Sequence, residues 1–128
     1  MQLLLDTHAL LWWLAEPELL SAPVLAALVD PSQQVFVSAA SAWEIATKHR
    51  LGRLPSADIV LQEGWTLLEA QGFVALPVTW RHGLRAGSYA LAHRDPFDRL
   101  LAAQAELDGL TLVTDDPALA SFPCRRLW

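Results

Sequence analysis

The chain has 128 residues, 53% of them hydrophobic, and this length predicts a single domain over residues 1–128. One cysteine, Cys124, excludes an internal disulfide framework and agrees with a reducing, cytoplasmic location. Charged residues make up 18% of the chain, which is low for an isolated domain and suggests that a partner or a second copy covers some apolar surface.

The first predicted elements are a buried strand and a helix. Gln2–Leu5 is a short apolar run, and Asp6 and Thr7 after it can cap a helix that Pro17 would end. This apolar start lacks a basic region and a small-residue cleavage site, so we interpret it as neither a signal peptide nor a membrane span.

Strands and helices then alternate along the chain. Further strands are predicted at 35–37, 73–77 and 110–114, with an edge strand at 124–127. Helices are predicted at 21–29, 38–50, 59–71, 79–92 and 99–107, and a short one begins at 116. This alternation favours a three-layer α/β/α fold around a central, mainly parallel sheet.

Six of the fourteen acidic residues fall where a parallel sheet gathers side chains. They follow a strand or lie early in a helix next to one: Asp6, Glu44, Asp95, Asp98, Asp115 and Asp116. Because residues just past the carboxyl ends of parallel strands meet in one crevice, we expect these acids to line one pocket. The other eight acids nearly balance nine Lys and Arg residues, so the net charge of −5 neither excludes nor supports RNA as a substrate.

Clustered carboxylates repel one another, so such a pocket needs a cation or a shared proton. Oxygen-only ligand sets suit Mg²⁺ or Mn²⁺, and the four histidines are too scattered for a zinc site. Acidic sites of this kind hydrolyse phosphodiester bonds, because the metal activates a water and stabilises charge on the attacking and leaving oxygens.

Each acid also has a structural interpretation. Ser41 and Glu44 have the spacing of a capping box, and Asp95 and Asp116, each followed by proline, fit helix N-caps. Asp6 differs, because a carboxylate directly after three leucines is costly unless it is paired, coordinated or solvated. Capping and metal binding are compatible, since a capping acid already lies near a strand end.

Four segments, in this order, resemble the PIN-domain toxins of the VapC type. They are Leu-Leu-Leu-Asp-Thr-His-Ala-Leu-Leu-Trp (3–12), Ser-Ala-Ala-Ser-Ala-Trp-Glu-Ile-Ala-Thr-Lys (38–48), His-Arg-Asp-Pro-Phe-Asp-Arg-Leu-Leu-Ala-Ala-Gln (93–104) and Leu-Val-Thr-Asp-Asp-Pro-Ala-Leu (112–119). The resemblance covers nearly the whole chain. It implies a Mg²⁺-dependent endoribonuclease, the toxin of a VapBC-type toxin–antitoxin pair.

Carried over to this chain, the resemblance implies a catalytic, metal-binding quartet of Asp6, Glu44, Asp98 and Asp116. Asp6 and Asp98 are expected to bind Mg²⁺, or Mn²⁺ in its place, directly, and the other two to complete the site. Asp95 and Asp115 leave the assignment open, because each lies close to a member of the quartet. Thr7 or Thr114 is expected to orient a carboxylate or a water.

The resemblance also implies partners: an RNA substrate, a cognate antitoxin, a homodimer that assembles with the antitoxin into a larger complex, and DNA contacted only through the antitoxin. No membrane contact is expected. Candidate phosphate contacts lie near the acids in sequence, with ordinary helix-end charge as the other explanation: Lys48, Arg50, Arg53, Arg94 and Arg99. The core is expected to take most of the six tryptophans, with Trp12 or Trp13 at a partner surface.

Two alternatives stay open from the sequence. A PIN-like module that binds RNA or protein without cleaving would keep the same fold. A haloacid-dehalogenase-like phosphatase also starts with an aspartate after its first strand, but the second acid two residues later is His8 here.

Overall fold

The computed structural model describes residues 1–54 and 57–128, and within them five strands form one sheet in the order β3-β2-β1-β4-β5. Every pairing in the sheet is parallel, which confirms the predicted mainly parallel sheet. The strands are β1 (Gln2–Leu5), β2 (Gln34–Ser38), β3 (Val74–Leu76), β4 (Thr111–Val113) and β5 (Arg125–Leu127).

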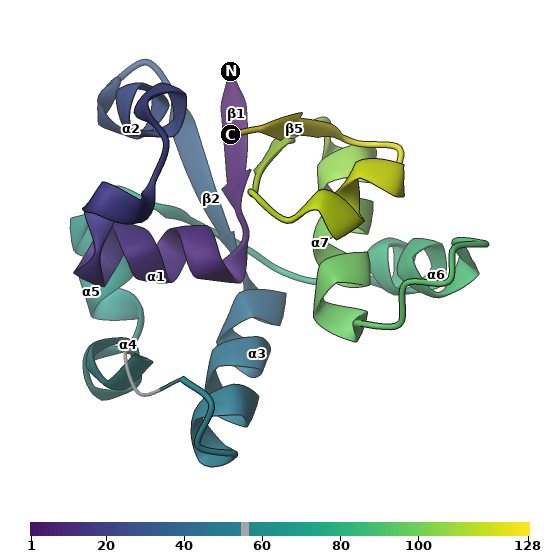
Figure 1. The fold of residues 1–128 in the computed structure, drawn as a ribbon, viewed down its shortest axis with the longest axis horizontal. Coiled ribbons are helices and arrows are strands. Elements are labelled where there is room, and N and C mark those ends of the chain that lie inside the picture. The colour runs from purple at the N-terminus through teal and green to yellow at the C-terminus, as the bar shows by residue number, and fades with distance from the viewer. Residues whose placement is uncertain (55–56) are drawn as a thin grey trace.

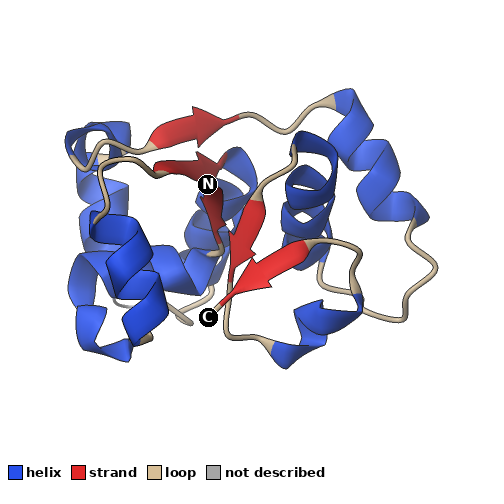
Figure 2. Ribbon diagram, turned by 90° about the horizontal axis from the view of Figure 1, so that it is seen from above, coloured by secondary structure: helices blue, strands red, loops and turns tan. Residues whose placement is uncertain are grey.

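Helices cover both faces of this sheet, as Figures 1 and 2 show. In Figure 1, α1, α2, α4 and α5 lie to the left of the strands, α6 and α7 lie to the right, and α3 lies below them. The helices are α1 (Thr7–Ala15), η1 (Pro17–Leu19), α2 (Ala22–Val29), α3 (Ala39–Arg50), α4 (Asp58–Glu63), α5 (Trp65–Ala70), α6 (Trp80–Ser88), α7 (Pro96–Asp108) and η3 (Pro117–Ser121). The predicted three-layer α/β/α architecture is therefore confirmed.

Two hydrophobic cores lie on the two faces of the central strands. Side chains alternate along a strand, so Leu3 and Leu5 join the core under α1 to α3, whereas Leu4 joins the core under α7. Val113 and Leu112 of β4 divide between the cores in the same way, and all five side chains are fully buried. This explains why the central strands are apolar without interruption.

Two predicted helices differ from the observed ones. The helix expected at 59–71 is divided into α4 and α5 at Gly64, whose φ of +62° favours glycine and ends α4. The helix expected at 79–92 ends at Ser88, and a loop leads from Tyr89 to α7. Among the described residues, none of the helices has the length and apolar content needed to cross a bilayer.

Candidate functional site

A pocket of about 440 Å³ lies at the carboxyl ends of β1 and β4. The chain runs from β1 to one side of the sheet and later returns to β4 on the other side, so a crevice forms between these two strand ends. All six acids singled out from the sequence line it. The full lining is Asp6, Thr7, His8, Trp12, Glu44, Lys48, Asp95, Asp98, Asp115, Asp116 and Pro117.

Asp6 is the most enclosed aspartate of this pocket. Its N–H donates to the carbonyl of Val113 at 3.0 Å, and its carboxylate accepts from the N–H of Ala9 at 2.7 Å, which caps α1. Burial leaves Asp6 only 6% exposed and raises its pKa to about 6, although contact with the Thr114 side chain and the Ala9 N–H opposes the rise. The anionic form of Asp6 is therefore short of stabilising partners.

Glu44 is a buried carboxylate inside α3 and does not cap that helix. The N-cap is Ser38, so the capping-box interpretation of Ser41 and Glu44 is wrong because α3 begins three residues earlier than that motif requires. Glu44 is 3% exposed; its Oε1 accepts from the hydroxyl of Thr7 at 2.5 Å, and its Oε2 pairs with Lys48. Thr7 thus orients a carboxylate.

Lys48 is the basic side chain nearest to the acids. Burial would lower its pKa, but the hydrogen bond and attraction of Glu44 outweigh burial and raise it, with Asp95 and Asp98 adding to the rise. The ammonium therefore stays charged inside an acidic pocket and partly neutralises it.

Asp95 and Asp98 have different surroundings, although they are one helical turn apart. Asp95 is the N-cap of α7 and accepts from the N–H groups of Phe97 (2.9 Å) and Asp98 (3.2 Å). The Asp98 carboxylate instead contacts Nε2 of His93 at 2.9 Å. Burial raises the pKa of Asp98, and the nearby charges of Asp95 and Glu44 raise it further, against the effect of His93.

The last two acids, Asp115 and Asp116, also differ in their surroundings. Asp116 caps η3 by accepting from the N–H of Ala118 at 2.9 Å, and its own N–H donates to the hydroxyl of Thr114 at 3.1 Å. Asp115 is exposed. The predicted capping roles of Asp6, Asp95 and Asp116 are therefore confirmed, while all three remain on the pocket wall.

The donor set fits a hard divalent cation. Six carboxylates face one lysine and one histidine in the lining, and both Asp6 and Asp98 have raised pKa values, as expected where negative charge is uncompensated. Among the described residues, no three His, Cys, Asp or Glu side chains are already placed to hold a metal together. Glu44 already has a hydrogen-bond partner on each oxygen, Thr7 on Oε1 and Lys48 on Oε2.

Arg99, which was a candidate for phosphate contact, has another role. Its guanidinium donates hydrogen bonds to the backbone between α6 and α7, so its prediction as a phosphate ligand is wrong. The acceptors are the carbonyls of Ala86 (2.8 Å), Tyr89 (2.6 Å), Leu91 (3.1 Å) and His93 (2.7 Å). Arg99 thereby fixes the loop that carries His93 to Asp98, a role for which the sequence has no local signal.

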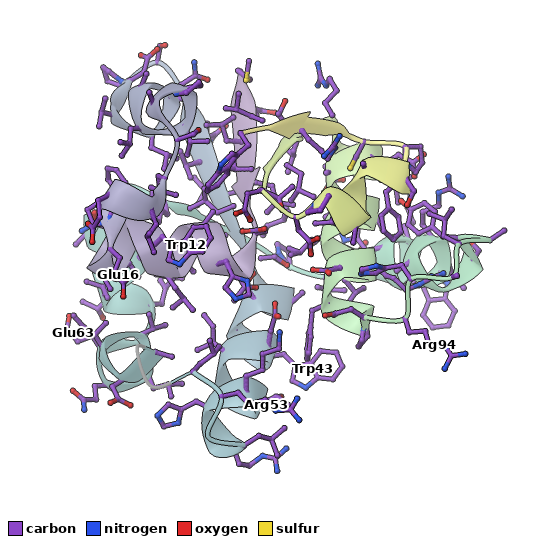
Figure 3. All side chains as sticks on the ribbon, in the orientation of Figure 1. Trp12, Glu16, Trp43, Arg53, Glu63 and Arg94 are labelled. Atoms are coloured by element: carbon purple, nitrogen blue, oxygen red, sulfur yellow. The ribbon has the colours of Figure 1, made fainter. Side chains whose placement is uncertain are left out.

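The other candidate phosphate contacts lie outside the pocket, except for Lys48. Arg50, Arg53 and Arg94 are exposed, and Figure 3 shows Arg53 and Arg94 projecting outward from the protein. They remain available for longer-range contacts with a phosphate backbone.

Most of the tryptophans lie outside the core, contrary to the prediction. None of the six indoles is fully buried, and only Trp12 and Trp13 pack against a core, as partly buried side chains. Four are exposed: Trp43 (54%), Trp65 (39%), Trp80 (82%) and Trp128 (36%). Trp13 donates from Nε1 to the side chain of Gln71 at 3.1 Å, whereas Trp12 lines the acidic pocket.

Comparisons with known proteins identify the family of this chain. The PIN domain model matches residues 3–123. Ribonuclease VapC22 of Mycobacterium tuberculosis is 34% identical over 121 residues, which are 92% of this chain and 89% of that protein.

Two solved structures share the fold at low sequence identity. One is VapBC2 from Rickettsia felis bound to a DNA fragment from its promoter. It has a TM-score of 0.63 at 14% identity, and the match covers 99% of this chain and 98% of the other. The other is FitAcB from Neisseria gonorrhoeae, with a TM-score of 0.60 at 19% identity, and the match covers 100% of this chain and 97% of the other.

Proposed function

The chain belongs to the PIN-domain family, and we propose that it is a metal-dependent endoribonuclease that acts as the toxin of a VapBC-type toxin–antitoxin pair. Membership confirms the family resemblance drawn from the sequence and removes the haloacid-dehalogenase alternative. The observation that carries the proposal is the pocket in which six carboxylates from four separate segments converge. The similarity to a protein named as a ribonuclease supports RNA as the substrate.

The proposed catalytic and metal-binding residues are Asp6, Glu44, Asp98 and Asp116, with Mg²⁺ as the cation and Mn²⁺ as a substitute. Asp6 and Asp98 would bind directly, because burial and like charge leave these two carboxylates short of compensation. When bound, the cation supplies an activated water and stabilises charge on the attacking and leaving oxygens. A 5′-phosphate and a 3′-hydroxyl are the proposed products.

The protein's own side chains orient this site. Thr7 directs one oxygen of Glu44 toward α1, and Lys48 contacts the other oxygen. His93 contacts the Asp98 carboxylate through Nε2 and orients it. Lys48 lines the same pocket and would be placed to contact a phosphate oxygen of the RNA.

The test is RNA cleavage by purified, antitoxin-free protein. We expect a mixed single-stranded RNA pool to be cut in Mg²⁺ and left intact in EDTA, and Asp98→Asn to abolish cutting. Asp115→Asn is the matched control, because it removes an exposed carboxylate from the same pocket and is expected to leave most of the activity. Folded protein that binds RNA but cuts none in Mg²⁺ or Mn²⁺ would instead support the non-catalytic module.

A cognate antitoxin is the proposed protein partner, and DNA would be contacted only through it. A second pocket, of about 500 Å³, supports a protein partner, because its walls are nearly all apolar and come mainly from β2, β3, α1, α3, α4 and α5. Ala42 is an exposed residue of that wall. We expect Ala42→Arg to prevent inhibition by the antitoxin without loss of RNA cleavage.

We also propose that the protein forms a homodimer, that the homodimer assembles with the antitoxin into a larger complex, and that it acts in the cytoplasm. The low share of charged residues and the exposed apolar side chains on α6, Trp80 and Leu84, support a covered surface. Size measurements on the free protein and on its complex with the antitoxin would test both assemblies.

A further inference from the structure

We propose that Trp12 forms a subsite for one unpaired nucleobase next to the scissile phosphate. This inference rests on the proposed ribonuclease function and deepens it, because it names a residue that selects the substrate. The starting observation is that an indole lines the same pocket as the six carboxylates.

The chemistry of the pocket walls separates the parts of a nucleotide. A phosphate is anionic and must lie where a cation and Lys48 offset the carboxylates. A nucleobase is neutral and flat, so it can pack against an apolar wall without the cost of removing a charge from water. Trp12 and Pro117 provide that wall, and base stacking on an aromatic ring is a common way to hold single-stranded RNA.

The Trp12 ring is held in place by its neighbours. Trp128 packs edge-on against it, with ring centroids 5.7 Å apart and an interplanar angle of 63°. His8, one helical turn earlier on α1, lies 5.8 Å away with its ring tilted by 50°. A platform that is already ordered loses little conformational entropy when a base stacks on it.

Trp12 also lies at a fixed, short distance from Asp6, one of the proposed catalytic acids. Asp6 caps α1, and Trp12 follows six residues later on the same helix, a rise of about 9 Å. A base on Trp12 therefore belongs to a nucleotide near the bond that is cut, so Trp12 would influence where RNA is cleaved.

The other tryptophans do not meet these conditions. Trp13 is engaged by Gln71 and lies outside the pocket lining. Trp43 packs edge-on against Phe97, with centroids 4.6 Å apart, and projects from α3 outside the lining, as Figure 3 shows. Trp80 is 82% exposed on α6 and does not line the acidic pocket.

The test combines protein variants with abasic substrates. A short single-stranded RNA containing a cleavage site of the wild-type protein is made with one base at a time removed on either side of the cut. We expect one abasic position to lower kcat/KM of the wild-type protein by roughly 5- to 100-fold. Trp12→Ala should lose a similar factor on the intact RNA and become insensitive to that abasic position.

Matched variants separate stacking from folding. Trp12→Phe keeps an aromatic face and should retain sensitivity to the abasic position, whereas Trp12→Leu keeps apolar volume without the ring and should lose it. Trp43→Leu, which removes an indole outside the pocket lining, should keep the sensitivity of the wild type to the abasic position. Thermal unfolding of each variant shows whether it is folded, and Phe and Leu at this position allow the comparison even where Ala does not fold.

Three results would overturn the inference. Equal sensitivity of wild type and Trp12→Leu to every abasic position means that no base stacks on Trp12. Unchanged RNA cleavage by Trp12→Leu together with lost inhibition by the antitoxin assigns the indole to the protein partner. Absence of any RNA cleavage by the wild-type protein overturns the ribonuclease proposal itself, and the subsite falls with it.

Discussion

The hydroxyl of Thr7 lies 2.5 Å from Oε1 of Glu44, and this contact joins the first turn of α1 to the buried side of α3. Both residues are almost completely buried, and Ser41 lies 3.0 Å from the same hydroxyl. The acidic pocket is therefore organised by hydrogen bonds between helices as well as by strand ends.

Thr7→Val keeps the shape of the side chain and removes the hydroxyl. We expect it to destabilise the protein by about 1–3 kcal/mol, because a buried carboxylate oxygen loses its donor. Cleavage should fall as well, since Glu44 is no longer oriented. Urea unfolding and kcat/KM measure both effects, and Thr7→Ser, which restores the hydroxyl, should recover most of each. Equal values for Val and Ser would show that the contact contributes nothing.

Stability without metal should fall as pH rises from about 4 to 6. The folded protein binds the Asp6 proton more tightly than the unfolded chain does, since burial raises the pKa from 3.8 to about 6. The contribution of Asp6 to the free energy of unfolding therefore falls by up to about 3 kcal/mol across this pH range, and it stays constant at higher pH. Urea unfolding in EDTA at several pH values measures the slope.

Asp6→Asn removes that titration and is the matched variant. It should flatten the slope and stabilise the metal-free protein at neutral pH, while Asp115→Asn should leave the slope unchanged. The raised pKa of Asp98 adds to the slope in the same direction. A pH slope of Asp6→Asn equal to that of the wild type would contradict the assignment of Asp6 as a buried, uncompensated carboxylate.

Arg99→Lys should loosen the loop between α6 and α7. A lysine cannot reproduce the planar fork that donates to four carbonyls, so buried acceptors lose their donors and stability falls by roughly 2 kcal/mol or more. Faster amide hydrogen exchange across Tyr89–His93 and lower kcat are expected. Arg94→Lys, a change at an exposed arginine, is the control. Unchanged exchange in the Arg99 variant would show that the loop is fixed by other contacts.

Lys48→Met should increase the affinity for divalent cations and decrease the rate of RNA cleavage. The ammonium competes for Glu44 and offsets the acidic field, so its loss favours a cation in the pocket. The same loss removes a contact for RNA phosphate. Calorimetric titration with Mn²⁺ and a cleavage assay measure the two effects, with Arg50→Met as control. A variant that binds Mn²⁺ more weakly would contradict this role.

Much of this fold follows from local pattern. The apolar strands, the proline-marked caps at Asp95 and Asp116, and the gathering of acids at strand ends are consequences of periodicity and strand direction. The assignment of Asp6, Glu44, Asp98 and Asp116 as metal ligands stays a prediction until a metal is bound.

The structure differs from the predictions where tertiary contacts, and not local sequence, determine the conformation. A glycine in a helical pattern is ambiguous, and at Gly64 the backbone takes a positive φ and divides the helix. Arg99 looked like a ligand for phosphate because its four carbonyl partners become neighbours only after α6 and α7 pack. The contact between Trp12 and Trp128, which are far apart in the sequence, likewise forms only in the folded chain.

The most direct test of a cation site in this pocket is anomalous diffraction from crystals of the protein grown with Mn²⁺. We expect a strong peak between the carboxylates of Asp6 and Asp98, which is absent from crystals of Asp98→Asn and unaffected by Asp115→Asn. A peak outside the pocket, or none in crystals of a protein that cleaves RNA in Mn²⁺, would contradict the assignment of these acids as the metal-binding site.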